Sequence, residues 1–198
     1  MGLVYQHIRI ANAARPELEE VDAKALVDSG AYELCITPLV AIVEAIAGTQ
    51  KAARLARSLG VRNWRADHDT GAFRVEGPDA WKFALTTLMP VGSTSFGVPV
   101  RDGVDDIALA FMTDAYSRVY RNRVAVLAPA ASIRTAGGLE VITDQRQQNA
   151  EVDEMLQSPP SRLPARALDL ALVDIGRRFG NETAGRIAHQ LEYTRNEF

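Results

Sequence analysis

A short acidic turn near the amino terminus has the residue types that could carry chemistry. Asp28 ends an apolar run that includes Leu26 and Val27, and Ser29 and Gly30 follow it. Small residues after an aspartate allow a tight turn whose backbone N–H groups hydrogen bond to the carboxylate. Two close aspartates that share one proton have separated pKa values, so one activates water while the other acts as an acid. Asp28 is therefore a candidate catalytic residue, and the alternative is a plain turn that ends a strand.

Residues 1–40 resemble the bacterial retropepsin-like (clan AA) aspartic peptidases. The match rests on residues 24–31 around Asp28 and on shorter matches at residues 4–5, 14–16 and 34–36. The resemblance implies that Asp28 is the catalytic aspartate and that the partner is a second copy of the chain, which forms a homodimer. The family also has a later hydrophobic-hydrophobic-glycine segment that braces the active loop, and no such segment follows residue 40 at a suitable distance. A second Asp-Thr-Gly-Ala, at residues 69–72, does not follow a buried strand and is interpreted as a turn.

The single cysteine, Cys35, is the second candidate nucleophile. The pattern predicts a short strand over residues 32–36 and a buried, almost wholly apolar helix over residues 38–47. A thiol near a helix amino terminus has a lowered pKa and is a better nucleophile. The alternative is a small buried side chain without a reaction. One cysteine excludes an intramolecular disulfide and any metal site built from cysteines.

His68 and a group of three arginines are two further candidate ligand sites. His68 lies between two aspartates, but neighbours along a chain point in different directions, so an exposed turn is the favoured interpretation. Arg118, Arg121 and Arg123 could hold an anion, and a solvated surface is the favoured interpretation. We therefore predict no metal ion and no cofactor.

The composition is ordinary for a soluble globular protein of 198 residues, with 47% hydrophobic and 24% charged residues. The net charge of −3 predicts neither nucleic acid nor a membrane as a partner. No apolar run reaches the roughly 18 residues of a membrane span, and residues 1–12 do not resemble a secretory signal. Cytoplasmic localisation is the expectation.

The remaining pattern predicts an α/β protein. In the first half, the expected elements are strands over residues 4–10 and 21–27, a basic helix over 50–59, a helix over 80–88, and a loop or boundary over 91–103. In the second half they are strands over 106–111 and 123–128, a helix over 113–121, a hairpin around Gly137, a partly helical polar segment over 144–157, and helices over 165–179 and 182–193.

The carboxyl-terminal half resembles the PfpI/ThiJ family of the class I glutamine amidotransferase-like superfamily. The matching blocks are residues 123–129, 133–142, 167–172, 178–180 and 188–193. The resemblance implies a flavodoxin-like parallel sheet with flanking helices, here incomplete or rearranged, to which N-terminal β strands are added. The family usually has a cysteine on a strand-to-helix elbow between the second and third blocks. Residues 158–164 occupy that place without a cysteine, which favours a non-catalytic binding or structural module.

The predicted organisation is a single α/β domain over residues 1–198. The alternative is a boundary within 91–103 that separates a part over 1–90 from a PfpI/ThiJ-like part over 104–198. Three functions stay open: a non-catalytic module, an aspartic peptidase that uses Asp28 across a homodimer, and a hydrolase that uses Cys35. A fusion or an artificial sequence would explain two resemblances in one chain.

Overall fold

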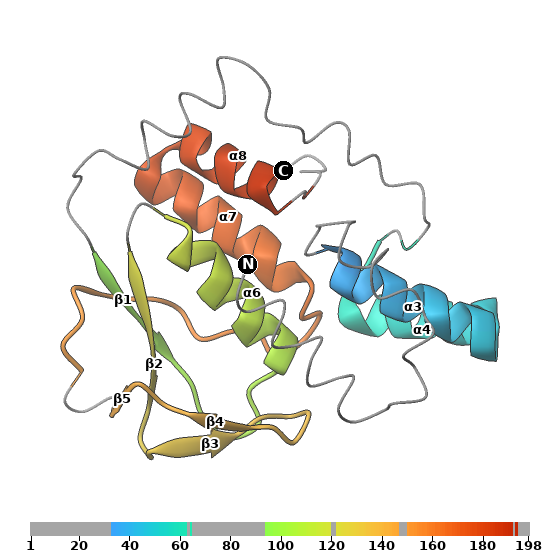
Figure 1. Ribbon diagram of the computed structural model, residues 1–198, viewed down its shortest axis with the longest axis horizontal. Helices are drawn as coiled ribbons and strands as arrows, with labels where there is room; N and C mark the ends of the chain where they lie inside the picture. Colours follow the sequence, from blue (N-terminus) through green and yellow to red (C-terminus); the bar gives the residue numbers. More distant parts are fainter. Residues whose placement is uncertain are drawn as a thin grey trace.

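The computed structural model describes residues 33–62, 64, 94–119, 122–146, 150–191 and 193 (Figure 1). The expected strands over residues 4–10 and 21–27 and the expected helix over 80–88 lie outside these ranges. The described elements are α3 (Glu33–Ala47), α4 (Thr49–Leu59), β1 (Ser95–Pro99), α6 (Asp106–Ser117), β2 (Arg123–Ala128), β3 (Ser132–Arg134), β4 (Glu140–Ile142), β5 (Gln145–Arg146), β6 (Glu154–Met155), α7 (Arg166–Phe179) and α8 (Asn181–Gln190).

A four-stranded parallel sheet, in the order β5-β2-β1-β6, organises the described residues. Strands β1 and β2 pair along their lengths, from Ser95 beside Arg123 to Pro99 beside Leu127. The outer strands pair through two residues each. Parallel neighbours need a crossover connection, and α6 supplies it between β1 and β2. The protein is thus a mixed α/β fold with a parallel sheet and flanking helices, as the sequence predicted.

Helices α6, α7 and α8 pack beside the sheet and build the main core with it (Figure 1). The ring of Phe96 in β1 lies 5.3 Å from the ring of Tyr116 in α6 and 6.0 Å from the ring of Phe179 in α7, measured between centroids. The apolar stripe of α7, with Leu172 and Ile175 fully buried, faces this core. The predictions of α7, α8 and β2 from their periodicity are confirmed, as is the antiparallel β3–β4 hairpin.

The prediction of a strand over residues 106–111 is wrong, because these residues form the first half of α6. A continuous apolar run of five residues fits a buried strand and a buried helix equally well. The carboxylate of Asp105 decides between them, since it accepts hydrogen bonds from the backbone N–H groups of Ile107 and Ala108, both at 3.0 Å. This is a standard helix amino-terminal cap.

The expected loop over residues 91–103 is also wrong where the structure describes it, because β1 lies within that segment at the centre of the sheet. Gly97 and Pro99 gave the segment its loop-like composition. Glycine leaves room for its neighbours at position 97, where a β-carbon would overlap Leu127 Cδ1 and lie 2.9 Å from the sulfur of Met155, so that both side chains would have to shift. Pro99 is the last residue of the strand, where a missing N–H costs least.

The polar segment over residues 144–157 contains the short strands β5 and β6 and no helix among its described residues. Both strands lie at edges of the sheet and pair with a longer neighbour. Asp153, directly before β6, fixes the start of this strand. Its carboxylate accepts hydrogen bonds from the N–H of Ser95 at 2.7 Å and from the Ser95 hydroxyl at 2.8 Å. Contacts of this kind join distant parts of the chain, so local polarity does not predict them.

Helices α3 and α4 form a separate helical hairpin at the side of the α/β body (Figure 1). The predicted strand over residues 32–36 is wrong from Glu33 onward, because α3 begins there. The helices over 38–47 and 50–59 are confirmed, and Gly48 and Gly60 follow them with positive φ of 84° and 83°. No helix in the described ranges is long and apolar enough to cross a membrane.

The predicted burial of α3 is wrong for much of its apolar surface. Val40 is fully buried with Ala52 and Ala56 of α4, but Leu39 is 48% exposed and Ile46 is 79% exposed. Apolar composition favours burial only where another element covers the helix, and α4 covers one side. The hairpin meets the body at its open end, where the N–H of Ala165 donates to the carbonyl of Leu59 at 2.9 Å.

We predict that Gly97→Ala lowers the free energy of unfolding by about 1–3 kcal/mol, because the new methyl group overpacks the space between β2 and β6. The matched control is Gly185→Ala in α8, where a β-carbon meets nothing within 4 Å. This control should be stabilised by about 0.5–1 kcal/mol, as expected for alanine in a helix. Urea unfolding followed by circular dichroism measures both. A Gly97→Ala protein as stable as the parent would contradict the central position of β1.

Candidate functional site

The structure describes only one of the two candidate catalytic residues that the sequence predicted. Asp28 lies outside the described residues, as does His68, so the peptidase hypothesis stays a prediction. Cys35 is the third residue of α3, so it lies inside a helix and does not follow a strand at an elbow. The local run around Cys35 is short and apolar, which suits a helix as well as a strand.

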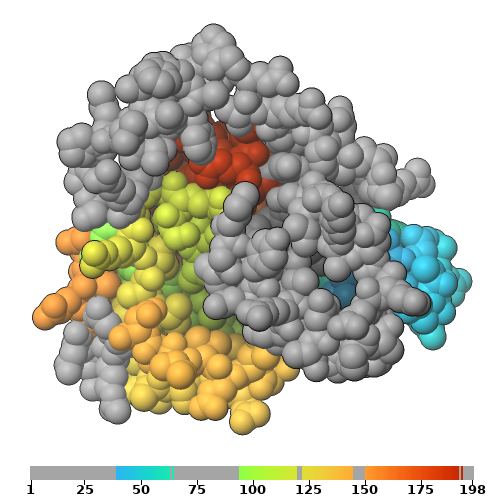
Figure 2. All heavy atoms as spheres, in the orientation of Figure 1, coloured from blue at the N-terminus to red at the C-terminus, as the bar shows by residue number. Residues whose placement is uncertain are grey.

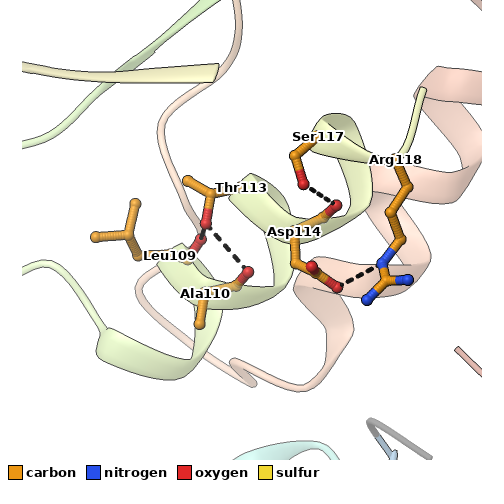
Figure 3. A network of polar contacts seen from close by, with 6 residues as sticks. All are labelled: Leu109, Ala110, Thr113, Asp114, Ser117 and Arg118. Carbon is orange, nitrogen blue, oxygen red and sulfur yellow. Dashed lines mark hydrogen bonds and ion pairs between the residues drawn. The ribbon is translucent and has the colours of Figure 1, made fainter. Parts of the chain in front are cut away.

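The arginine cluster is partly accounted for by an ion pair within α6. Nε of Arg118 donates to Oδ2 of Asp114 at 2.9 Å, one helical turn away (Figure 3). The hydroxyls of Thr113 and Ser117 donate to carbonyls of their own helix in the same region. Arg123 is exposed at the start of β2, and Arg121 lies outside the described residues. Arg118 is therefore engaged in a structural contact, which does not support an anion site on this side chain.

The loop that leaves the carboxyl end of β1 is fastened to the β3–β4 hairpin. The N–H of Gly103 donates to the carbonyl of Arg134 at 2.7 Å, and the N–H of Ala136 donates to the carbonyl of Val104 at 2.8 Å. Oδ1 of Asp102 accepts from the N–H of Arg134 at 2.8 Å. Gly103 has φ of 81°, which a glycine adopts without strain. These bonds hold the hairpin against the amino terminus of α6.

Asp106 lies between the start of α6 and the hairpin turn. A β-carbon on Gly137 would overlap Oδ2 of Asp106, so the carboxylate lies directly against the glycine backbone. Oδ1 of Asp106 is buried and has no hydrogen-bond partner within the described residues. A buried acceptor without a donor costs about 1–3 kcal/mol, and such groups in proteins are normally satisfied by water, an ion or a ligand. The sequence pattern did not identify Asp106 or Gly137 as candidate site residues, because they are 31 positions apart and only folding brings them together.

This carboxylate lies near the place where parallel α/β sheets bind ligands. The chain leaves β1 toward β2 on one side, and β6 pairs with β1 on the other side. A reversal of this kind opens a crevice beyond the carboxyl ends of the strands. The loop after β1 carries Asp106 at its end, and the loop after β6 is held to the sheet by the N–H of Leu156, which donates to the carbonyl of Gly97 at 2.8 Å.

The turn before α7 occupies the place of the elbow cysteine in the family resemblance. Leu163 is the residue with unusual geometry there, and it is the one non-glycine among the described residues with positive φ, 53°. This conformation costs a residue with a β-carbon about 1–2 kcal/mol. A leucine is not a nucleophile. Its Cβ instead lies close to Gly60, 3.0 Å from where a β-carbon on that glycine would be, so the turn holds the end of α4.

A second polar network lies at the other end of the helices and ties α6, α7 and β6 together. The buried hydroxyl of Tyr116 and Nε of Arg178 both donate to Oδ2 of Asp174, the latter at 2.7 Å. Arg178 also forms an ion pair with Glu154 of β6. Burial raises the pKa of Tyr116 well above its usual value, and the bond to Asp174 raises it further. Tyr116 is therefore a neutral donor with a structural role at ordinary pH.

The charge of Asp174 acts on Arg178 as well. Burial lowers the pKa of Arg178, but the hydrogen bond and charge of Asp174 outweigh it, so the net shift is upward. The spacing of Asp174 and Arg178, four residues apart on a helix, is visible in the sequence as an ion pair. The participation of Tyr116 and Glu154 requires the packed structure.

At the start of β1, both hydrogen bonds from Ser95 lower the pKa of Asp153.

No metal centre is found among the described residues, where no three of the His, Cys, Asp and Glu side chains come together as ligands. His189, the histidine that the structure describes, lies on α8.

No protein-family model and no curated protein matches the sequence. Several solved structures are similar to about half of the chain. Oxidized DJ-1 of Toxoplasma gondii has 15% identity and a TM-score of 0.45, with 51% of this chain and 99% of DJ-1 covered. An AraC family transcriptional regulator from Pseudomonas putida has 9% identity and a TM-score of 0.38, with 48% and 96% covered. A ThiJ/PfpI family protein from Pseudomonas syringae has 14% identity and a TM-score of 0.34, with 52% and 42% covered.

We predict that Tyr116 makes the fold sensitive to alkaline pH. Its folded pKa is raised above the unfolded value of 10.0, so the unfolded chain releases the proton first and stability falls as pH rises above 10. The loss approaches about 1.4 kcal/mol per pH unit for this one group. Tyr116→Phe should lower stability at pH 7 by about 1 kcal/mol and reduce the alkaline slope. Urea unfolding of both proteins between pH 7 and 11 measures this, and parallel stability curves would contradict the assignment.

Proposed function

We propose that this chain is a non-catalytic binding module with a PfpI/ThiJ-like α/β core, and that Asp106 binds a small molecule that carries a positive charge or an N–H donor. The single observation that carries the proposal is the buried Oδ1 of Asp106, which has no hydrogen-bond partner within the described residues. Ammonium, guanidinium and amide N–H groups are the natural partners of such an oxygen.

The other carboxylates at this end of β1 are already engaged, which leaves Asp106 for a ligand. Asp102 accepts from the backbone of Arg134, and Asp105 caps α6 with two hydrogen bonds. Asp106 as a whole is partly exposed, although its Oδ1 is buried, so we propose that a ligand reaches this oxygen when the residues around it move apart. The hairpin bonds around Gly103 hold the carboxylate in place before a ligand arrives, which reduces the entropy cost of binding.

The same residues support binding rather than catalysis. Covalent catalysis needs a nucleophile with a base within hydrogen-bond reach. Leu163 stands at the turn before α7, where the family resemblance implies a cysteine. General acid–base catalysis by carboxylates uses two groups with separated roles, and two of the three carboxylates at this end are occupied by backbone donors. One unpaired carboxylate is suited to recognising a donor.

We predict that small primary amines or guanidines raise the melting temperature of the protein, whereas neutral alcohols of the same shape do not. At a ligand concentration of a hundred times Kd, the free energy of unfolding rises by about 2.7 kcal/mol. Asp106→Asn should lose this stabilisation. Gly137→Ala should lose this stabilisation too, because the new methyl group displaces the carboxylate of Asp106. The side chain of Asp106 can rotate away, so the loss of folding stability should be small.

The matched control is Glu182→Gln, which removes an exposed carboxylate from the first turn of α8. It should retain full stabilisation by the ligand. Circular dichroism establishes that each variant is folded before ligand is added. Equal stabilisation of the parent and Asp106→Asn would contradict the proposal, as would a panel of amines and guanidines with no effect on the parent.

A further inference from the structure

Helix α4 has a strongly basic exposed face. Lys51, Arg54 and Arg57 are exposed along the helix, and Arg62 is exposed just beyond it. The sequence contains no acidic residue from Ala45 to Arg62. None of the four cations has an ion pair with another residue in the described ranges. Four charges of one sign on a short segment make a local positive field in a chain whose net charge is −3.

The free end of the same hairpin also exposes apolar side chains. Ile46 is 79% exposed two residues before Gly48, which connects α3 to α4, and Leu39, in the middle of α3, is 48% exposed. Figure 1 shows this turn at the end of the hairpin farthest from the sheet. In Figure 2 the coloured residues of the hairpin lie at one edge of the molecule.

We propose that the α3–α4 hairpin docks on an anionic lipid membrane through its turn at Gly48 and the basic face of α4. Ile46 would enter the boundary between headgroups and acyl chains, while Lys51, Arg54 and Arg57 contact the headgroup phosphates and carboxylates. A segment that exposes both basic and aliphatic side chains is typical of a membrane interface. The hairpin lies on the membrane and does not cross it. The surface is separate from Asp106, so this proposal does not depend on the proposed ligand.

Two features favour a lipid surface over nucleic acid as the acidic partner. A phosphate backbone would satisfy the cations of α4, but it would leave Ile46 in water. A membrane takes up both kinds of group at once. The net charge of the whole chain predicted no membrane partner, but screening over about 8 Å at physiological salt makes the local charge of the hairpin decisive.

The test is sedimentation of the full chain with large unilamellar vesicles. Vesicles of phosphatidylcholine with 30 mol% phosphatidylserine, on the order of typical anionic content, are compared with phosphatidylcholine alone. Binding is expected to the anionic vesicles, with a decrease as salt is raised from about 50 to 500 mM because the charges become screened. Centrifugation of the protein without vesicles shows whether the protein sediments by itself.

Two variants test the two parts of the surface. The triple variant Lys51→Gln, Arg54→Gln, Arg57→Gln should weaken binding by about a hundredfold, since each basic residue near the surface contributes about a factor of five. Ile46→Asn should weaken binding several-fold without a change in its salt dependence. All four positions are exposed, so the fold should persist.

Matched controls place the same changes elsewhere. Arg101→Gln, Arg134→Gln, Arg177→Gln removes three exposed charges outside the hairpin, and Ile142→Asn changes an isoleucine that is 82% exposed on β4. Both controls should bind like the parent. Equal loss in the charge control would overturn the proposal by showing that only net charge matters. Equal binding to neutral vesicles, or no binding to anionic ones, would also overturn it.

Two other partners are outcomes that would overturn the proposal. Tight binding to duplex DNA without binding to vesicles would assign the basic face to nucleic acid. Sedimentation without vesicles that is lost in Ile46→Asn would assign the turn at Gly48 to self-association of two copies. Binding of the parent to anionic vesicles that both hairpin variants reduce, and both controls retain, supports it.

Discussion

The described fold depends on the position of β1 between two parallel neighbours. This strand pairs with β2 on one side and β6 on the other, and the small volume at Gly97 lets both approach. Its side chains Phe96 and Val98 are fully buried in the main core. The loop after β1 then sets where α6 begins, and α6 sets the position against which α7 packs. A shift of one residue in β1 would turn the buried side chains to the other face of the sheet.

The two ends of this sheet differ in how well their polar groups are satisfied. At the amino end, Tyr116, Asp174 and Arg178 satisfy one another, and Asp153 is satisfied by Ser95. At the carboxyl end, the hairpin bonds position Asp106, but its buried oxygen has no partner within the described residues. The described polar groups are therefore satisfied more fully at the amino end of the sheet than at the carboxyl end.

The α3–α4 hairpin follows a different principle from the body. Its own core is small, with Val40, Ala52 and Ala56 at the centre, and it joins the body through Leu59 and the strained turn at Leu163. An apolar helix with one covered side leaves Ile46 in solvent, which is unfavourable for an isolated protein. A surface that combines this exposure with exposed cations is consistent with a function in association.

The sequence by itself determined the α/β class, the strand β2, the β3–β4 hairpin, and the helices α4, α7 and α8. The helices have an amphipathic period, the hairpin has a glycine turn between short strands, and β2 is a short apolar run. It did not determine β1, because Gly97 and Pro99 are uncommon within strands. It did not determine the first half of α6, because a short apolar run fits both a strand and a helix. The burial of α3 likewise depended on which element covers it.

The candidate site shows the same limit more sharply. Asp102, Asp105 and Asp106 are three similar residues in one acidic stretch. The role of Asp105 is local, because it caps the helix that follows it, whereas tertiary structure decided the role of Asp102, which a backbone donor from the distant hairpin reaches. Asp106 meets a glycine that gives it space but no hydrogen bond within the described residues. Hydrogen-bond satisfaction depends on groups that folding brings together, so the sequence supplied the carboxylates and only the folded chain decided which one remains unpaired.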